Sequence, residues 1–209
     1  MGIFHFPSNF VYWENIENHE NIKSVLMKKI LELDQEKFKD HMINNATTNY
    51  TGSDDITKYL NIDMIKELVW DPLANLLLKI KLTPNYPNIE ISEAFIGSSW
   101  YTKYDKNGSF RLHNHSSKDH FINGKPFQST FSMIYILNDE NERNTTLFKD
   151  LNLSSLSTLR TTEFQFFTGD VEEIKEGTVI IFPSSLYHEV LDVEKPGRIT
   201  IAFNILCGF

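Results

Sequence analysis

The sequence is poor in cysteine, in positive charge and in long apolar runs. Its 209 residues include one cysteine, Cys207, so no disulfide can form within the chain. Lysine and arginine number 20 against 28 acidic residues, and this net charge of −8 argues against binding to duplex nucleic acid or anionic lipid. No apolar run is long enough to span a bilayer, and the first residues lack the features of a signal peptide. We therefore expect a cytoplasmic protein without membrane contact.

Apolar and aromatic side chains, in contrast, are plentiful. Hydrophobic residues make up 41 % of the chain and aromatic residues 13 %, with 16 phenylalanines among them. This composition can bury a substantial core, which argues against disorder. The length fits one domain, or a compact domain with an appendage.

The first third of the chain carries helical patterns. Apolar residues recur at spacings of three and four at Ile22, Val25, Leu26, Ile30 and Leu33. A second pattern from Ile62 to Val69 is interrupted at Asp71-Pro72, where an aspartate cap and a proline in the first turn predict a fresh helix. We expect residues 1–88 to form a helical buttress within the same domain as the rest of the chain.

After Pro84 and Pro87 the pattern changes to short strands. We expect strands within residues 89–104, 110–115, 128–137, 146–148, 162–167, 171–174, 178–182, 186–191 and 198–206. Turns are expected at Asn107-Gly108, Glu176-Gly177 and Pro196-Gly197. Many short strands at this spacing indicate a sandwich or barrel. The predicted fold is therefore α+β, mainly β with N-terminal helices, with residues 89–209 as its β core.

The last predicted strand has two different faces. One face is apolar and carries Ile199, Ile201, Phe203 and Ile205. The other carries Arg198, Thr200, Ala202 and Asn204, which suits a cavity. A buried arginine is costly without an anionic partner, and the sequence offers no obvious dedicated acid for Arg198. We therefore expect a ligand carboxylate beside it.

Three histidines form a candidate metal site. His113 and His115 are two residues apart in an extended segment, so their side chains point the same way, and His188 flanks a later strand. Imidazole ligands suit iron, zinc, copper or nickel, and three of them with open positions suit catalysis more than structure.

The order of these motifs resembles the Fe(II)/2-oxoglutarate-dependent oxygenases of bacteria and phages, and the wider prolyl-hydroxylase-like group. The resemblance covers roughly residues 89–206. It rests on Tyr104, Gly108, residues 112–115, 131–135, 177–183, 187–188 and 198–205. It implies a double-stranded β-helix, or jelly roll, with the metal in its mouth. A phage-encoded protein would act in the host cytoplasm.

The resemblance also assigns metal ligands. It implies that His113 and His188 bind Fe(II), while His115 stands where the wider group has a carboxylate. Asp119 or His120, from the segment that follows, is the alternative third ligand. We favour His115, because residues two apart share a face of an extended segment without any loop rearrangement.

Further positions match cosubstrate-binding residues of the resembled family. Arg198 matches the residue that binds the distal carboxylate of 2-oxoglutarate, and Thr200 resembles its hydroxyl partner. Tyr104 could add a phenol hydrogen bond to the cosubstrate, although an amphipathic core tyrosine is an equally good interpretation. Trp100, Ser132 and Asn204 are candidates for pocket lining.

The implied activity is oxidative decarboxylation of 2-oxoglutarate with O2, coupled to hydroxylation of an unidentified small molecule or protein side chain. Residues 118–127 and 139–161 are expected to rim the pocket. Two alternatives remain open: a non-catalytic jelly-roll binding or structural module, and a cupin-like metalloenzyme without an oxo-acid cosubstrate. A helical face left uncovered would favour a homodimer.

Overall fold

A computed structural model of the chain describes most of its residues. The described residues are 2–5, 9–33, 43–50, 55–82, 91–116, 120–141, 143–150 and 164–208. The helical elements are α1 (His19–Glu32), η1 (Ile56–Tyr59), α2 (Ile62–Ile65), η2 (Lys66–Trp70), α3 (Asp71–Lys81) and η4 (Thr168–Asp170). The strands are β1 (Gly2–His5), β2 (Phe10–Asn15), β3 (Ile43–Thr48), β4 (Glu93–His113), β5 (His120–Ile122), β6 (Lys125–Asn138), β7 (Thr146–Asp150), β8 (Phe164–Phe167), β9 (Thr178–Pro183), β10 (Tyr187–Val190) and β11 (Arg198–Gly208).

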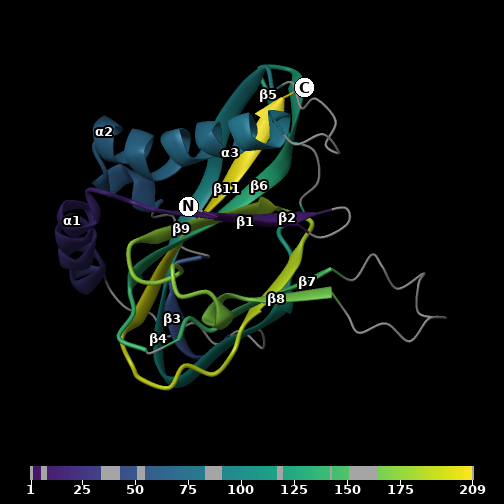
Figure 1. Cartoon of the computed structure of the whole chain (residues 1–209). Helices are drawn as coiled ribbons and strands as arrows, with labels where there is room; N and C mark the ends of the chain where they lie inside the picture. Colours follow the sequence, from purple (N-terminus) through teal and green to yellow (C-terminus); the bar gives the residue numbers. More distant parts are fainter. Residues whose placement is uncertain are drawn as a thin grey trace.

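These strands form one curled antiparallel sheet. Their order is β1-β2-β9-β6-β11-β4-β10-β7-β8, with β3 beside β4 and β5 beside β6. The sheet bends into a half-barrel, so that β7 and β8 lie across from β6 and β9 (Figure 1). This is the double-stranded β-helix, or jelly roll, and the predicted fold class is confirmed.

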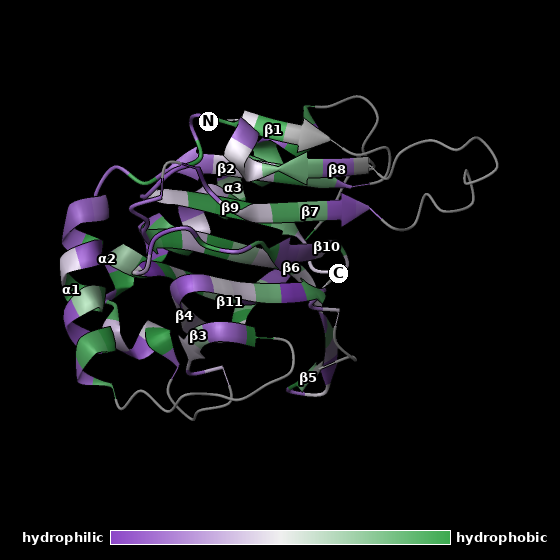
Figure 2. Cartoon of the chain, turned by 90° about the horizontal axis from the view of Figure 1, so that it is seen from below, coloured by the Kyte–Doolittle hydropathy of each residue, from purple (hydrophilic) through white to green (hydrophobic). Residues whose placement is uncertain are grey.

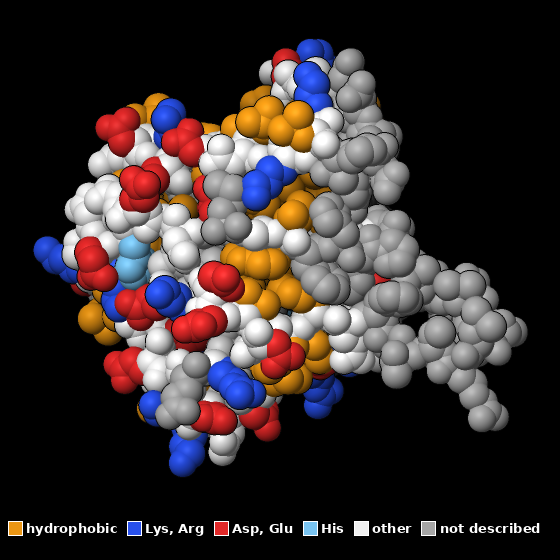
Figure 3. Space-filling model, in the orientation of Figure 1, with side chains coloured by type: hydrophobic (Ala, Val, Ile, Leu, Met, Phe, Trp, Pro, Cys, Tyr) orange, Lys and Arg blue, Asp and Glu red, His pale blue; other side chains and the backbone are white. Residues whose placement is uncertain are grey.

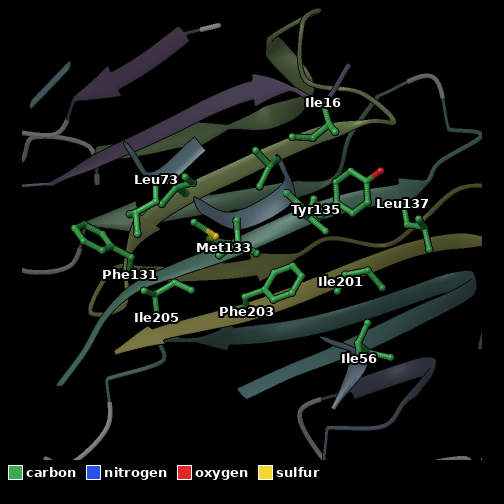
Figure 4. Packing of buried hydrophobic residues seen from close by; sticks show 14 of the residues in the cluster. Ile16, Ile56, Leu73, Phe131, Met133, Tyr135, Leu137, Ile201, Phe203 and Ile205 are labelled. Atoms are coloured by element: carbon green, nitrogen blue, oxygen red, sulfur yellow. The ribbon is translucent and has the colours of Figure 1, made fainter. Parts of the chain in front are cut away.

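The helices cover the outer face of this sheet. Helix α1 buries Ile22, Leu26 and Ile30, while Figure 2 shows that it also carries hydrophilic segments. These residues join one large cluster with α3 and with the outward faces of β6, β9 and β11. In Figure 4, Leu73 of α3 lies against Met133 and Phe131 of β6. The predicted buttressing role of the helical patterns follows from this shared core.

A second cluster fills the inside of the half-barrel. Phe148 of β7 and Phe182 of β9 are fully buried there, with ring centroids 4.9 Å apart. Ile134 and Ile136 of β6 join them, because alternate residues of a strand face opposite sides of the sheet. The functional cavity lies against this inner face, where residues of even number on β6 and β11 point.

One polar cluster anchors α1 to the sheet. His19 of α1 lies 2.6 Å (Nδ1) from the hydroxyl of Tyr135 and 3.2 Å (Nε2) from a carboxylate oxygen of Glu176. Lys23 also contacts Glu176, so this group of residues already balances its charge. A Cβ atom at Gly177 (φ +86°) would lie 3.1 Å from His19, which explains a glycine at the close approach. Tyr135 is thus a fully buried core residue.

The interruption predicted at Asp71-Pro72 is wrong in its detail. Trp70 and Asp71 both have right-handed helical backbone angles, so the helix runs on through Pro72 and Asp71 is not a cap. The turn before it, η2, is π-helical. Proline lacks an N–H and crowds the preceding turn, and a widened turn accommodates it. Ile62, the first residue of that pattern, is 81 % exposed, whereas Leu68 and Val69 of the pattern are buried together with Met64.

Three expectations about strands also need correction. The first third is not purely helical, since β2 pairs with β9 and β3 pairs with β4 in the same sheet. Asn107-Gly108 does not end a strand: β4 continues through it as a bulge, with Asn107 at φ +61°. Residues 171–174 form turns rather than a strand. The domain bounds 1–88 and 89–209 stay a prediction.

The surface carries side chains of both charges. Acidic and basic side chains are interspersed on the face shown in Figure 3, with hydrophobic patches between them. Among the described residues, no helix is both long enough and apolar enough to cross a membrane.

Candidate metal centre

A cavity of about 340 Å³ opens on the inner face of the sheet, where β4, β10 and β11 meet. The sequence-predicted residues that line it are Trp100, Tyr104, His113, His115, His188, Arg198, Thr200 and Asn204. The histidines stand at one end and Arg198 at the other, so one cavity joins the two predicted functional groups.

Strand pairing brings His113 and His188 together. They are direct partners between the antiparallel strands β4 and β10, and their ring centroids lie 4.3 Å apart. His115 lies just beyond the end of β4, where its backbone N–H donates to the Ser184 carbonyl at 2.8 Å. The predicted shared direction of His113 and His115 is thus present, although the strand itself ends at His113.

The three imidazoles turn their donor atoms toward one point. One ring nitrogen of each lies within 4.8 Å of the others, and the Nε2 atoms of His113 and His115 are 3.1 Å apart. Each Nδ1 faces an oxygen acceptor: the Arg111 carbonyl at 2.7 Å, the Asn204 amide oxygen at 2.9 Å and the Leu186 carbonyl at 3.4 Å. A proton on each Nδ1 leaves every Nε2 lone pair directed inward.

Burial keeps these histidines neutral. It lowers the pKa of His113, and it lowers the pKa of His115 to about 4 with a further contribution from nearby His113. Burial lowers the pKa of His188 well below its usual value, and the other two imidazoles act in the same direction. Neutral imidazole is the form that binds metal.

This arrangement fits a divalent transition metal. Inward lone pairs on neighbouring Nε2 atoms repel each other unless a cation lies between them, and imidazole suits iron, zinc, copper and nickel. The donor set formed by these residues contains no carboxylate. A bound metal would therefore keep its full charge until an anionic ligand arrives.

At the other end of the cavity, Arg198 is fully buried. Its terminal nitrogens donate to the hydroxyl of Thr145, to the hydroxyl of Thr146 at 3.0 Å and to the amide oxygen of Asn144 at 3.4 Å. A guanidinium has five N–H donors, more than these three acceptors use.

The expectation that Arg198 has no dedicated acid is wrong. Its Nε lies 3.5 Å from Oδ2 of Asp139, whose side chain is 5 % exposed. Asp139 directly follows β6, and the antiparallel pairing of β6 with β11 carries it back to the start of β11. This ion pair could not be predicted from the sequence, because the two residues are far apart along the chain.

Tyr104 and Thr200 lie beside Arg198. In the sheet Tyr104 pairs with Arg198, and Thr102 pairs with Thr200. Burial raises the pKa of the Tyr104 phenol, while Arg198 and the hydroxyls of Thr200 and Thr102 oppose that rise. The guanidinium carbon of Arg198 lies 5.6 Å from the Tyr104 ring centroid. A carboxylate at this end would meet a cation and several hydroxyl donors.

The remaining predicted residues have different positions. Trp100 and Asn204 line the cavity, whereas Ser132 is fully buried behind His115, 3.1 Å (Oγ) from its Nδ1. Asp119, the side chain of His120 and residues 118, 142 and 151–161 of the predicted rim lie outside the described residues, whereas Thr146 of that rim lines the cavity.

Sequence reasoning placed Asp139, Asn144, Thr145 and Thr146 only within the predicted rim, and it missed that they surround Arg198. The pairing of Thr146 with Val190 brings this run to the cavity. A polar Asn-Thr-Thr run before a predicted strand was the available signal. Tyr50 was also missed: its ring meets Trp100 edge-on, with centroids 4.8 Å apart, at the cavity wall.

Solved structures with this fold include several oxygenases. The chain is similar to OsALKBH1 (TM-score 0.60, 12 % identity, covering 96 % of this chain and 99 % of that one). It is also similar to an oxidoreductase of the 2OG-Fe(II) oxygenase family from Burkholderia pseudomallei (TM-score 0.59, 11 % identity, 93 % and 84 %). A Pseudomonas putida prolyl-4-hydroxylase matches as well (TM-score 0.53, 11 % identity, 94 % and 91 %). At these identities the likeness establishes the fold.

No curated protein matches the chain. A family model does: that of a 2OG-Fe(II) oxygenase family matches residues 98–204, which is just over half of the sequence and includes all three histidines and Arg198. The chain belongs to this 2OG-Fe(II) oxygenase family.

Proposed function

We propose that the protein is an Fe(II)/2-oxoglutarate-dependent dioxygenase in which His113, His115 and His188 hold the iron. The support is the convergence of three neutral imidazoles whose Nδ1 atoms all face oxygen acceptors. Family membership favours iron among the metals that three imidazoles suit.

The oxo-acid would bind toward the Arg198 end. Arg198 would take the distal carboxylate with its terminal nitrogens, because its Nε faces Asp139. Thr200 would add a hydroxyl from the same strand face, and Tyr104 a phenol from the paired strand. A dianionic oxo-acid would also offset the charge of a metal held by neutral ligands.

One observation carries the proposal: the histidines and Arg198 line the same cavity. A metal site alone fits many chemistries, and a buried arginine alone can be structural. Together in one cavity they can hold an oxo-acid by both of its ends.

When bound, iron would supply the activation of O2 needed for decarboxylation of the oxo-acid and hydroxylation of a second substrate. The chain's own residues would orient the two substrates and exclude water. Ile43, Tyr50 and Phe110 line the cavity as neutral, largely apolar wall, and a charged group would be desolvated there. An uncharged part of a small molecule or protein side chain fits this wall best.

The test is turnover without a second substrate. Purified protein with iron(II), ascorbate and 2-oxoglutarate should form succinate, and His113→Ala should abolish this. Thr200→Val should raise the 2-oxoglutarate concentration needed for half-maximal turnover while leaving metal binding unchanged. Protein that binds neither metal nor 2-oxoglutarate would contradict the proposal.

A second candidate, a cupin-like metalloenzyme without an oxo-acid, gains support from one observation. Asp139 already balances the charge of Arg198, so this arginine has a structural role without a ligand. Calorimetric titration of the metal-loaded protein distinguishes the two functions. Metal binding with no heat from 2-oxoglutarate would favour the second candidate.

A further inference from the structure

We infer that Asn204 is a positioning residue that sets the ring orientation and the tautomer of His115. The inference rests on the proposed function only in taking His115 as a metal ligand. It adds a residue that touches no metal but determines whether the third imidazole can bind one.

The contacts of Asn204 are specific. Its Oδ1 accepts from His115 Nδ1 at 2.9 Å and from the Ser132 hydroxyl at 3.0 Å. Its Nδ2 donates to the Ser98 hydroxyl at 3.2 Å. The amide is therefore held at both ends, and its oxygen is the end turned toward His115.

The sheet builds this arrangement. Asn204 of β11 pairs with Ser98 on β4 and with Ser132 on β6, so the three side chains form a row across neighbouring strands. Ser132 also meets the Ser184 hydroxyl at 3.0 Å, and Ser184 accepts the backbone N–H of His115 at 2.8 Å. Both the backbone and the ring of His115 are thus tied to one polar network.

His115 differs from the other two histidines in what accepts its Nδ1 proton. His113 and His188 each face the backbone carbonyl two residues earlier, at 2.7 and 3.4 Å. Those acceptors exist whatever side chains are present. His115 lies beyond the end of β4, and its Nδ1 faces the side chains of Asn204 at 2.9 Å and Ser132 at 3.1 Å instead, so its orientation depends on the identity of these two residues.

This dependence matters because an imidazole offers a metal only the nitrogen that carries no proton. Binding through Nε2 requires the proton on Nδ1, and an acceptor beside Nδ1 favours that tautomer. Asn204 supplies the acceptor as a neutral amide. A carboxylate at the same position would hold the same tautomer and add negative charge, which strengthens the imidazole as a ligand.

The test is cobalt(II) binding by metal-free protein, followed by visible absorption. Asn204→Leu should weaken binding by roughly 10–100-fold, the usual cost of losing such a partner, and should change the spectrum. Asn204→Asp should bind as tightly as wild type or more tightly. Asn75→Leu is the matched control, because this part-buried asparagine lies on α3 against Glu14, and its cobalt affinity should be unchanged.

The outcomes separate the possible failures. Wild-type affinity in Asn204→Leu, or weakening in Asn204→Asp equal to that in Asn204→Leu, would overturn the positioning role while leaving the metal site intact. Wild-type protein that binds no cobalt would overturn the proposed function together with this inference. If Asn204→Leu does not fold, Ser132→Ala tests the same network, and it should weaken binding by a few fold.

Discussion

The two ends of the cavity differ in how far the protein itself balances their charge. At the histidine end, the Nδ1 atom of each ring faces an oxygen acceptor, and the Nε2 atoms point toward a common centre. At the arginine end, the charge of Arg198 faces Asp139, and two threonines and an asparagine accept its hydrogen bonds. The donor atoms at the histidine end suit a cation, whereas the charge at the arginine end is already balanced within the protein.

This difference separates what each end needs from a ligand. The inward lone pairs of adjacent imidazoles are stabilised by a divalent transition metal, so metal binding should not depend on the oxo-acid. Arg198 must share its donors between the protein and an incoming carboxylate, so oxo-acid binding should be weaker and more easily lost.

Removing a histidine should have the largest effect. His188→Ala takes away one of three donors, and we expect metal affinity to fall by at least about 1,000-fold, given the large binding energies of metal sites. Calorimetric titration with cobalt(II) measures this. The backbone pairing of His188 with His113 and Phe148 does not use its imidazole, so the strand pairing should survive the substitution. Retention of metal affinity would exclude His188 as a ligand.

Breaking the Arg198–Asp139 pair should cost stability next. Arg198→Gln leaves a buried carboxylate without its cation, and we expect a loss of roughly 3 kcal/mol in the free energy of unfolding. Urea denaturation measures it. The double variant Arg198→Gln/Asp139→Asn should recover most of that stability but none of the 2-oxoglutarate affinity.

That double variant also tests the contrast itself. If it binds 2-oxoglutarate as wild type does, Arg198 is only a structural cation. If the single variant is as stable as wild type, then the pair contributes little, and the arginine end is less balanced than its contacts indicate.

Much of the fold was readable from local patterns, and the errors have a physical cause. Alternation in residues 198–206 correctly assigned the apolar row to the core and the polar row to the cavity, since period two is a local property. Asp71-Pro72 led to the wrong prediction of a new helix start, because proline disturbs a helix without always ending it. Here a π-helical turn before Asp71 accommodates the proline.

The site divides in the same way. His113, His115 and His188 were visible because imidazoles are rare and the spacing of two is local. Asp139 was invisible, because its contact with Arg198 depends on the register of β6 against β11. The role of Asn204 behind His115 was missed for the same reason, and it appeared only as possible pocket lining.

Acid should destabilise the metal-free protein through the histidine end. Burial lowers the pKa of all three imidazoles, so below pH 6.5 the unfolded chain binds protons that the folded chain does not. Stability is therefore full above pH 6.5 and declines as the pH falls toward the folded values, which is about 4 for His115. His115 alone should account for a loss of about 1.3 kcal/mol between pH 7.5 and 5.5, and the other two imidazoles add to it in the same direction. Urea denaturation at the two values measures it.

A variant shows whether the histidines cause that slope. His115→Leu removes one of the three groups and should reduce the loss between the two pH values. An unchanged slope would assign the acid sensitivity to other groups.

The smallest expected effect concerns Tyr104, whose two interpretations still differ. If its phenol hydrogen-bonds the oxo-acid, Tyr104→Phe should weaken 2-oxoglutarate binding by about 1 kcal/mol, roughly five-fold, and leave metal affinity unchanged. If it is a core residue only, the loss should appear in the free energy of unfolding, because its hydroxyl lies near those of Thr200 and Thr102. Titration with 2-oxoglutarate and urea denaturation of the same variant separate the two. Thr102→Val serves as the control, because Thr102 pairs with Thr200 in the sheet and its hydroxyl lies near the Tyr104 phenol. Equal losses of 2-oxoglutarate affinity in the two variants would mean that the phenol acts through Thr200 rather than on the ligand.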